Sequence, residues 1–80
     1  MKSRQGYNGY VIEARSCELK DNGFSAEFSV EEHDADGVME TEFYLPDSFR
    51  TQESAIEAAI QAGRQKIDMG FERGSVVVNG

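Results

Sequence analysis

The 80-residue chain has few of the residues on which small secreted or metal-bound domains depend. It contains one cysteine, one histidine and one proline, and it has no tryptophan. One cysteine cannot form an intramolecular disulfide, which excludes a disulfide-rich secreted scaffold. A zinc site is nearly excluded, because Cys17 and His33 are the only thiol and imidazole ligands. We therefore expect no cofactor, no metal and a cytoplasmic location.

Long apolar runs are also missing. The longest runs, such as Val76-Val77-Val78, have three residues and are far too short to cross a membrane. Residues 1–6 carry positive charge but no apolar stretch follows them, so they do not form a signal peptide. We expect no contact with a membrane.

Basic residues are scarce, and their scarcity is uneven. Eight Lys and Arg stand against fifteen Asp and Glu, for a net charge of −7. Residues 21–57 contain eleven acidic residues and one basic residue, whereas the two flanking segments are slightly positive. Nucleic-acid binding depends on neutralising phosphates with Lys and Arg, so we expect no nucleic-acid partner. A basic protein surface or a divalent cation suits this charge better.

Alternating apolar and polar residues predict strands in the first half of the chain. The alternation is strict in Phe24–Glu31 and returns in Met39–Leu45, and a less regular third segment covers Tyr10–Leu19. Such a period of two is typical of strands with one buried face and one exposed face. The three segments predict a three-stranded antiparallel meander.

Turn residues between these segments set the expected register. Asp21-Asn22-Gly23 is a strong hairpin signal. A two-residue loop there would turn Arg15 toward the core, whereas a three-residue loop with Gly23 as a glycine bulge keeps it outside. We favour the three-residue loop, which pairs Phe28 with Ser16.

The second turn, around Asp34–Gly37, has an even-numbered loop in either common form. It therefore places Phe28 and Phe43 on the same face, directly opposite each other or one step diagonal. Such an aromatic pair contributes about 0.5–1 kcal/mol beyond simple burial.

A helix is predicted over residues 51–69. Pro46 ends the preceding strand, Thr51 is the expected N-cap, and Gly70 ends the helix. Gly63 lies in the apolar stripe, where it permits close approach to the sheet. The stripe has helical spacing and comprises Ala55, Ile56, Ala59, Ile60, Gly63 and Ile67.

These elements predict an α+β fold of β-β-β-α order, with the C-terminal helix packed on one face of the sheet. A short fourth strand near 75–78 is an open alternative, since Ser75–Val78 has strand propensity. We expect a single domain over 1–80 with an ordered core at 9–70, and flexible ends at 1–6 and 79–80.

Two local motifs carry little functional signal. Glu32-x-Asp34-x-Asp36-Gly37 resembles the front of a calcium-binding EF-hand loop, but its twelfth position is Phe43 rather than a bidentate glutamate. A solvated hairpin turn is the better interpretation. We expect His33 to be an exposed turn residue and Cys17 to be a semi-buried packing residue.

The sheet face opposite the helix is the candidate interaction surface. One helix covers one face, so the other face stays solvated or meets a partner. Glu31 and Glu40 are expected opposite each other, and a basic partner would relieve their repulsion. A charged face that merely prevents aggregation is the alternative. The predicted surface comprises Glu13, Arg15, Glu27, Glu31, Glu40, Glu42 and Tyr44.

Several segments resemble a family of small uncharacterised proteobacterial proteins with a β-β-β-α fold. The similar residues are Gly23-Phe24-x-Ala26-x-Phe28, Asp36-Gly37, Phe49-x-Thr51-x-Glu53-x-Ala55-Ile56-x-Ala58-Ala59 and Gly63-Arg64-x-x-Ile67-Asp68-x-Gly70. The resemblance spans about residues 9–70. It implies the fold and a bacterial cytoplasmic setting, and it carries over no functional residues.

A weaker likeness connects the chain to the N-terminal domain of HicB-type antitoxins. The shared features are two hairpin strands, a glycine turn and a threonine-capped helix, here Thr51 to Ala55. The antitoxins normally have a further DNA-binding segment, which we do not expect in this chain. This likeness implies an antitoxin-like regulatory protein that binds a basic partner.

No acid–base pair in a known motif, phosphate loop or metal cluster is recognisable, so we do not expect an enzyme. The leading hypothesis is a small acidic protein-interaction domain. Its partner would be a protein with a basic surface or a second copy of the chain.

Overall fold

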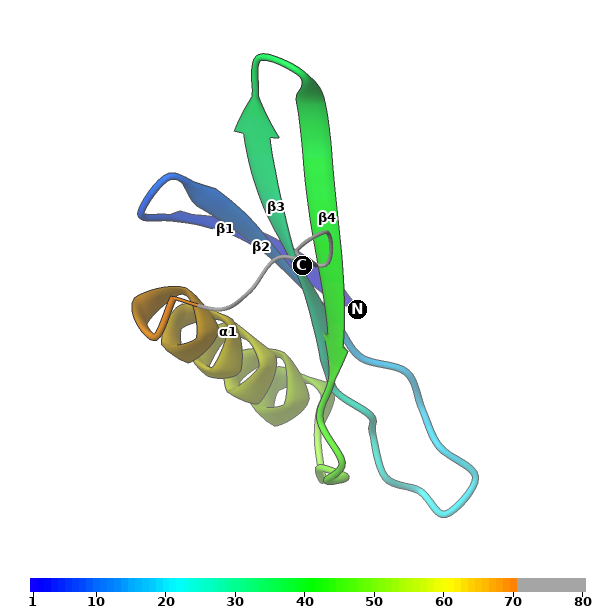
Figure 1. Cartoon of the computed structure of the whole chain (residues 1–80). Coiled ribbons are helices and arrows are strands. Elements are labelled where there is room, and N and C mark those ends of the chain that lie inside the picture. The colour runs from blue at the N-terminus through cyan, green and yellow to red at the C-terminus, as the bar shows by residue number, and fades with distance from the viewer. Residues whose placement is uncertain (71–80) are drawn as a thin grey trace.

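The computed structural model describes residues 1–70 and shows an antiparallel sheet with a single helix on one face (Figure 1). The α+β meander with a C-terminal helix is confirmed, but the sheet has four strands rather than three. The predictions for residues 75–78 and 79–80 lie outside the described residues. The elements, with the strands in sheet order, are β1 (Lys2–Tyr7), β2 (Tyr10–Arg15), β3 (Glu27–Asp34), β4 (Gly37–Tyr44) and α1 (Gln52–Asp68).

The additional strand is β1, formed by residues that were predicted to be flexible. That prediction is wrong because a two-residue turn, Asn8-Gly9, folds β1 back onto β2. Both turn residues have positive φ, 51° at Asn8 and 86° at Gly9. Asn-Gly favours this conformation, and its twist matches that of the paired strands. Tyr7 therefore lies opposite Tyr10, and the sheet gains a strand on the side of β2 away from β3.

The register between β2 and β3 differs from the prediction by two residues. Phe28 lies opposite Ala14 instead of Ser16. The three-residue loop begins one residue earlier than expected, because the Leu19 amide donates to the Gly23 carbonyl at 2.8 Å. Asn22, with φ of 69°, takes the left-handed position that was assigned to Gly23. A shift of two residues keeps every side chain on its predicted face.

The β3–β4 hairpin agrees with the sequence prediction. Phe28 lies directly opposite Phe43, with ring centroids 4.9 Å apart and an interplanar angle of 16°. The turn places Asp34 opposite Gly37, and the Asp36 amide donates to the Asp34 carboxylate at 2.9 Å. The motif that resembles an EF-hand is thus a hairpin turn at the end of a long two-stranded arm (Figure 1).

Helix α1 begins and ends as its capping residues predict. The Thr51 hydroxyl accepts a hydrogen bond from the Ser54 amide at 3.0 Å, which satisfies a free donor of the first turn. Gly70 has φ of 72°, and its amide donates to the Ile67 carbonyl just after the helix ends. Three small helix residues, Ala55, Ala59 and Gly63, are buried against the sheet.

The core lies between α1 and the inner face of the sheet. Ile12, Ala14, Phe28 and Val30 are almost completely buried there. Helix α1 packs on β1, β2 and β3, while β4 has no close backbone contact with it. The side chain of Lys66 on the helix reaches toward β4, and its ammonium lies 5.1 Å from the centre of the Phe43 ring.

The C-terminal end of α1 is tied to β1 by polar contacts. The Tyr7 hydroxyl donates to the Asp68 carboxylate at 2.9 Å, and Arg64 donates to the Gln5 side chain at 2.8 Å. The Arg64 guanidinium also lies 5.6 Å from the centre of the Tyr7 ring. Strand β1 is therefore held in the folded domain by contacts with the helix as well as by its pairing with β2.

Gly63 allows α1 to approach the sheet, and we expect Gly63→Ala to destabilise the protein. A Cβ atom at this position would lie 2.8 Å from Cγ2 of Ile12, a fully buried residue. Overpacking of this kind costs about 1–3 kcal/mol, although alanine is intrinsically about 1 kcal/mol better than glycine in a helix. Urea denaturation measures the change in unfolding free energy.

The control for this prediction is Gln61→Ala, at an exposed position of the same helix. It should change the unfolding free energy by less than about 0.5 kcal/mol. If Gly63→Ala were instead as stable as the unchanged protein, or more stable, the close contact between α1 and Ile12 would be refuted.

Candidate functional site

The sheet face away from the helix, here called the outer face, collects the predicted surface residues. The strand register arranges their side chains in three rows that cross the sheet. All seven predicted residues lie in these rows. From β1 to β4 the rows are Lys2, Arg15, Glu27, Tyr44; then Arg4, Glu13, Ser29, Glu42; and then Gly6, Val11, Glu31, Glu40.

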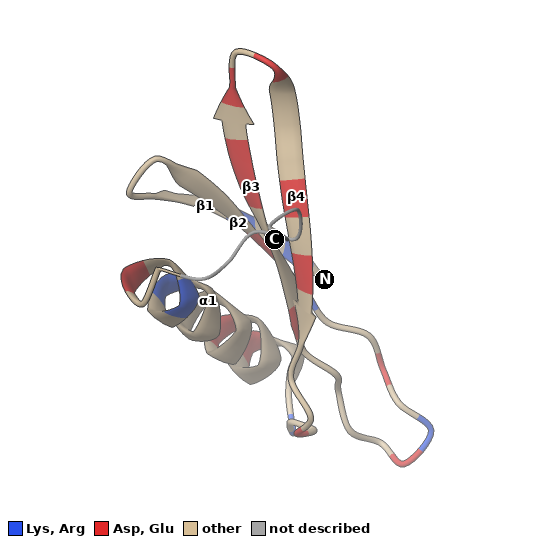
Figure 2. Ribbon diagram, in the orientation of Figure 1, with Lys and Arg blue, Asp and Glu red and all other residues tan. Residues whose placement is uncertain are grey.

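Charge on the outer face changes sign across the sheet, whereas the predicted surface was mainly acidic, with Arg15 as its one basic residue. Strand β1 contributes Lys2 and Arg4 and has no acidic residue, whereas β4 contributes Glu40 and Glu42 and has no basic residue. Figure 2 shows the red segments on β3 and β4. The face is therefore basic at its β1 edge and acidic at its β4 edge. The predicted sheet had no basic edge because it did not include β1.

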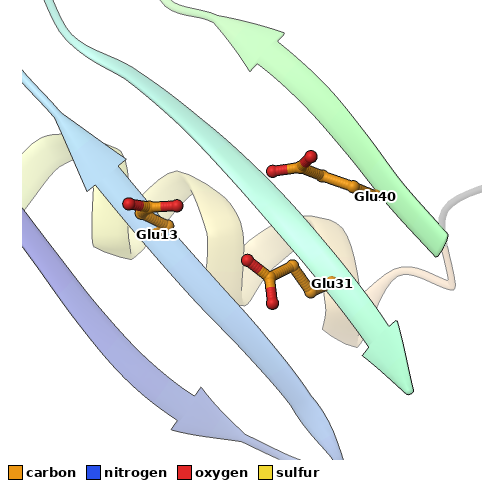
Figure 3. A group of neighbouring side chains, drawn as sticks. All are labelled: Glu13, Glu31 and Glu40. Atoms are coloured by element: carbon orange, nitrogen blue, oxygen red, sulfur yellow. The ribbon is translucent and has the colours of Figure 1, made fainter. Parts of the chain in front are cut away.

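Three carboxylates gather at the centre of the outer face. Glu13, Glu31 and Glu40 each bring an oxygen atom to within 4.8 Å of the other two (Figure 3). They come from β2, β3 and β4, and the expected direct pairing of Glu31 with Glu40 is present. Like charges in such positions destabilise a sheet unless a cation lies among them.

Arg4 supplies that cation from β1. Its guanidinium donates two hydrogen bonds to the Glu31 carboxylate, at 3.0 and 3.3 Å, and lies 3.6 Å from a Glu13 oxygen. The hydrogen bond from Arg4 lowers the pKa of Glu31 below its ordinary value, although burial of this carboxylate acts in the opposite direction. The charge repulsion predicted from the sequence is thus largely relieved within the chain.

The same guanidinium bears on whether the three carboxylates form a metal centre. A cation such as Ca²⁺ would use the oxygen atoms that now accept hydrogen bonds from Arg4. It would also have to displace a positive charge already held in place. We therefore interpret Glu13 and Glu31 as part of an ion-pair network that stabilises the sheet, with the Glu40 carboxylate beside it.

Arg15 is the second basic centre of this network. Its Nε donates to the Glu27 carboxylate at 3.2 Å, and its other nitrogens lie 3.6 Å from Glu13 and 3.8 Å from Glu42. Beyond it, the Tyr44 hydroxyl donates to Glu42 at 3.2 Å, and this hydrogen bond raises the pKa of Tyr44. Within residues 1–70, the one ion pair within 4.0 Å that joins this network to β4 is the long contact between Arg15 and Glu42.

Compensation is weakest on β4. Within residues 1–70, Glu40 has no ion-pair partner within 4.0 Å, and the Glu42 side chain is 49% exposed. Two large neighbours on the same strand, Val38 and Tyr44, are 58% and 68% exposed. We call Val38, Glu40, Glu42 and Tyr44 the β4 margin. It combines negative charge with accessible apolar and aromatic surface.

Cys17 and His33 do not build a separate site. Cys17 is exposed, so its predicted role in semi-buried packing is wrong. It lies after the end of β2, in the segment of the chain that connects β2 to β3, where its amide donates to the Ser25 hydroxyl. His33 is exposed as expected, but it belongs to β3, and its Nε2 lies 3.2 Å from Glu31. The imidazole thus extends the Glu31 network.

Two basic residues at the β1 edge, Lys2 and Arg4, were not predicted to belong to this face. Their segment lacks the alternation that indicates a half-buried strand, since only Tyr7 among its six residues is large and apolar. The available signal was the Asn8-Gly9 dipeptide between two tyrosines, a strong indicator of a two-residue hairpin.

We expect Arg4→Gln to raise the pKa of Glu31 toward its ordinary value, because the substitution removes both hydrogen bonds and a positive charge. Carboxyl chemical shifts followed by NMR during a pH titration measure this. A carboxylate whose pKa is lower in the folded state stabilises the protein at pH values above its unfolded-state pKa. This contribution disappears as the pH falls through the folded-state pKa. Arg4→Gln should therefore reduce the loss of stability on acidification.

Lys2→Gln is the control, because Lys2 lies 3.6 Å from Glu13 and makes no ion pair with Glu31. It should leave the Glu31 titration nearly unchanged. Equal shifts in the two variants would show that general surface charge, rather than the Arg4 contact, sets the Glu31 pKa.

Comparison of the chain with protein-family models, curated proteins and solved structures found no match. The resemblance to the proteobacterial β-β-β-α family and the likeness to HicB-type antitoxins thus remain predictions. Among residues 1–70, no helix has the length and apolar character needed to cross a membrane.

Proposed function

We propose that this chain is a non-enzymatic protein-interaction domain that binds a basic partner through the β4 margin. The observation that supports the proposal is the order of charge on the outer face. Arg4 and Arg15 compensate the carboxylates of β2 and β3, while Glu40 and Glu42 remain accessible on β4. Of the seven predicted surface residues, the proposal keeps the three on β4, and it adds Val38.

The chemistry of the β4 margin suits protein recognition. An exposed ion pair contributes about 0.2–1 kcal/mol, so two glutamates alone give a weak contact. Tyr44 and Val38 supply the aromatic and apolar surface on which interface affinity commonly depends. The glutamates then add orientation, faster association and discrimination against acidic proteins.

A partner different from this chain fits better than a second copy joined by the same edge. A two-fold dimer brings the same patch of each copy together. Two β4 margins in contact would oppose Glu40 and Glu42 to the same residues of the other copy. An antitoxin-like protein that neutralises a small basic toxin would be a special case of the proposed function.

The test compares charge reversal on β4 with charge reversal on the helix. A labelled peptide of alternating lysine and valine serves as the basic probe, and fluorescence anisotropy measures binding. We expect Glu40→Lys/Glu42→Lys to weaken binding by about tenfold or more, which corresponds to about 1.4 kcal/mol. Binding to the unchanged protein should weaken as salt is added.

Glu53→Lys/Glu57→Lys is the matched control, since it makes the same change in net charge at exposed positions of α1. It should retain affinity within about threefold, a difference under about 0.7 kcal/mol. Circular dichroism confirms that both variants fold. Equal losses in the two double variants, or full binding after reversal on β4, would overturn the proposed function.

A further inference from the structure

Within residues 1–70, strand β4 ends the sheet and lacks the proline and lysine residues that commonly block an edge strand. It pairs with β3 on one side, and no other element within residues 1–70 pairs with its second side. Its eight residues contain no proline and no lysine. Natural edge strands are commonly kept short or blocked by such residues or by bulges, because an open edge pairs readily with another strand.

The opposite edge of the sheet shows the contrast. Strand β1 is shorter, with six residues, and it contains Lys2, Arg4 and Gly6. Both basic side chains are already engaged, Lys2 with Glu13 at 3.6 Å and Arg4 with Glu31 at 3.0 Å. Of the two edges, β4 is therefore the longer one and the one without basic residues.

The hydrogen-bond pattern identifies which backbone groups of β4 face outward. The Leu45 amide donates to the Ala26 carbonyl at 3.0 Å, so residues 26 and 45 form a bonded pair. Bonded and non-bonded pairs alternate along an antiparallel ladder, and Glu42 and Glu40 fall in non-bonded pairs with β3. Their N–H and C=O groups consequently point away from β3, as do those of Val38 and Tyr44. The β4 margin thus presents side chains and open backbone groups together.

We propose that β4 accepts an extended basic segment of another protein as a fifth strand of the sheet. This proposal rests on the proposed function and specifies its partner. In an added antiparallel strand, the residues opposite Glu40 and Glu42 point to the outer face with Cβ atoms about 4.5–5.5 Å from theirs. Lysine or arginine at those two alternate positions meets both glutamates, while main-chain hydrogen bonds to β4 supply affinity.

A second copy of this chain is a poorer occupant than a basic segment of another protein. Pairing β4 with β4 places acidic residues against acidic residues. Pairing β4 with the β1 strand of another copy gives complementary charge, but it uses two different edges and continues indefinitely into a fibre. Charge and closure together favour a separate basic chain.

The test uses the full-length protein and three hexapeptides of identical charge with blocked ends, based on Lys-Val-Lys-Thr-Lys-Val. One is unmodified, one is N-methylated at its lysines, and one is N-methylated at the residues between them. When the lysines face Glu40 and Glu42, their backbone N–H groups donate to β4. N-methylation of the lysines removes these backbone donors, whereas the third peptide keeps them. We expect the lysine-methylated peptide to bind at least about tenfold more weakly than the other two, or about 1.4 kcal/mol.

Amide exchange followed by NMR gives the second readout. In the free protein, the amides of Glu40 and Glu42 should exchange faster than that of Thr41, which faces β3. The unmodified peptide should slow exchange at Glu40 and Glu42 by about tenfold or more under saturating conditions, since bound edge amides become hydrogen-bonded.

The remaining outcomes separate this inference from the proposed function. No binding by any peptide overturns both. Equal binding by all three peptides, without protection of Glu40 and Glu42, leaves the proposed function standing and overturns strand addition. Protection of these amides in the free monomer would mean that the chain itself fills the edge. Protection that grows with protein concentration would identify a second copy as the occupant, and either result overturns the proposal.

Discussion

The structure depends on one register shared by all four strands. Ile12 lies opposite Val30, and Val30 lies opposite Thr41, so one face of the sheet is apolar and packs against α1. A slip of one residue in any strand would exchange that strand's buried and exposed side chains. Three short turns hold the register, and two of them place an asparagine at positive φ. The core, the position of α1 and the charge pattern of the outer face all follow from this alignment.

Strand β1 has a dual role in this arrangement. It covers the free side of β2, and it brings Arg4 among carboxylates that would otherwise repel one another. Most of the acidic charge on β2 and β3 is therefore used inside the fold. Glu40 and Glu42 on β4 remain accessible, on the only edge of the described sheet that lacks basic residues. Stability at one edge and the proposed recognition at the other thus depend on the same distribution of charge.

Features encoded by neighbouring residues were predictable from the sequence. The Phe28–Phe43 pair, the Thr51 cap and the close approach at Gly63 depend on local periodicity or on one turn, and the structure contains all three. The β2–β3 register was wrong by two residues, because Asn22 rather than Gly23 adopts positive φ. The ion-pair network was out of reach once β1 was missed, since its central cation belongs to that strand. The predicted surface residues were correctly grouped on one face, but their compensation was not foreseen.

The shared register is tested most directly by nuclear Overhauser effects between Hα protons of facing residues. Non-bonded pairs of an antiparallel ladder bring Cα atoms to about 4.5 Å, which gives strong Hα–Hα cross-peaks. The structure predicts such cross-peaks for Arg4 with Glu13, Ile12 with Val30, and Glu31 with Glu40. Cross-peaks displaced by one residue, or none between β1 and β2, would contradict both the charge order of the outer face and the role assigned to its acidic edge.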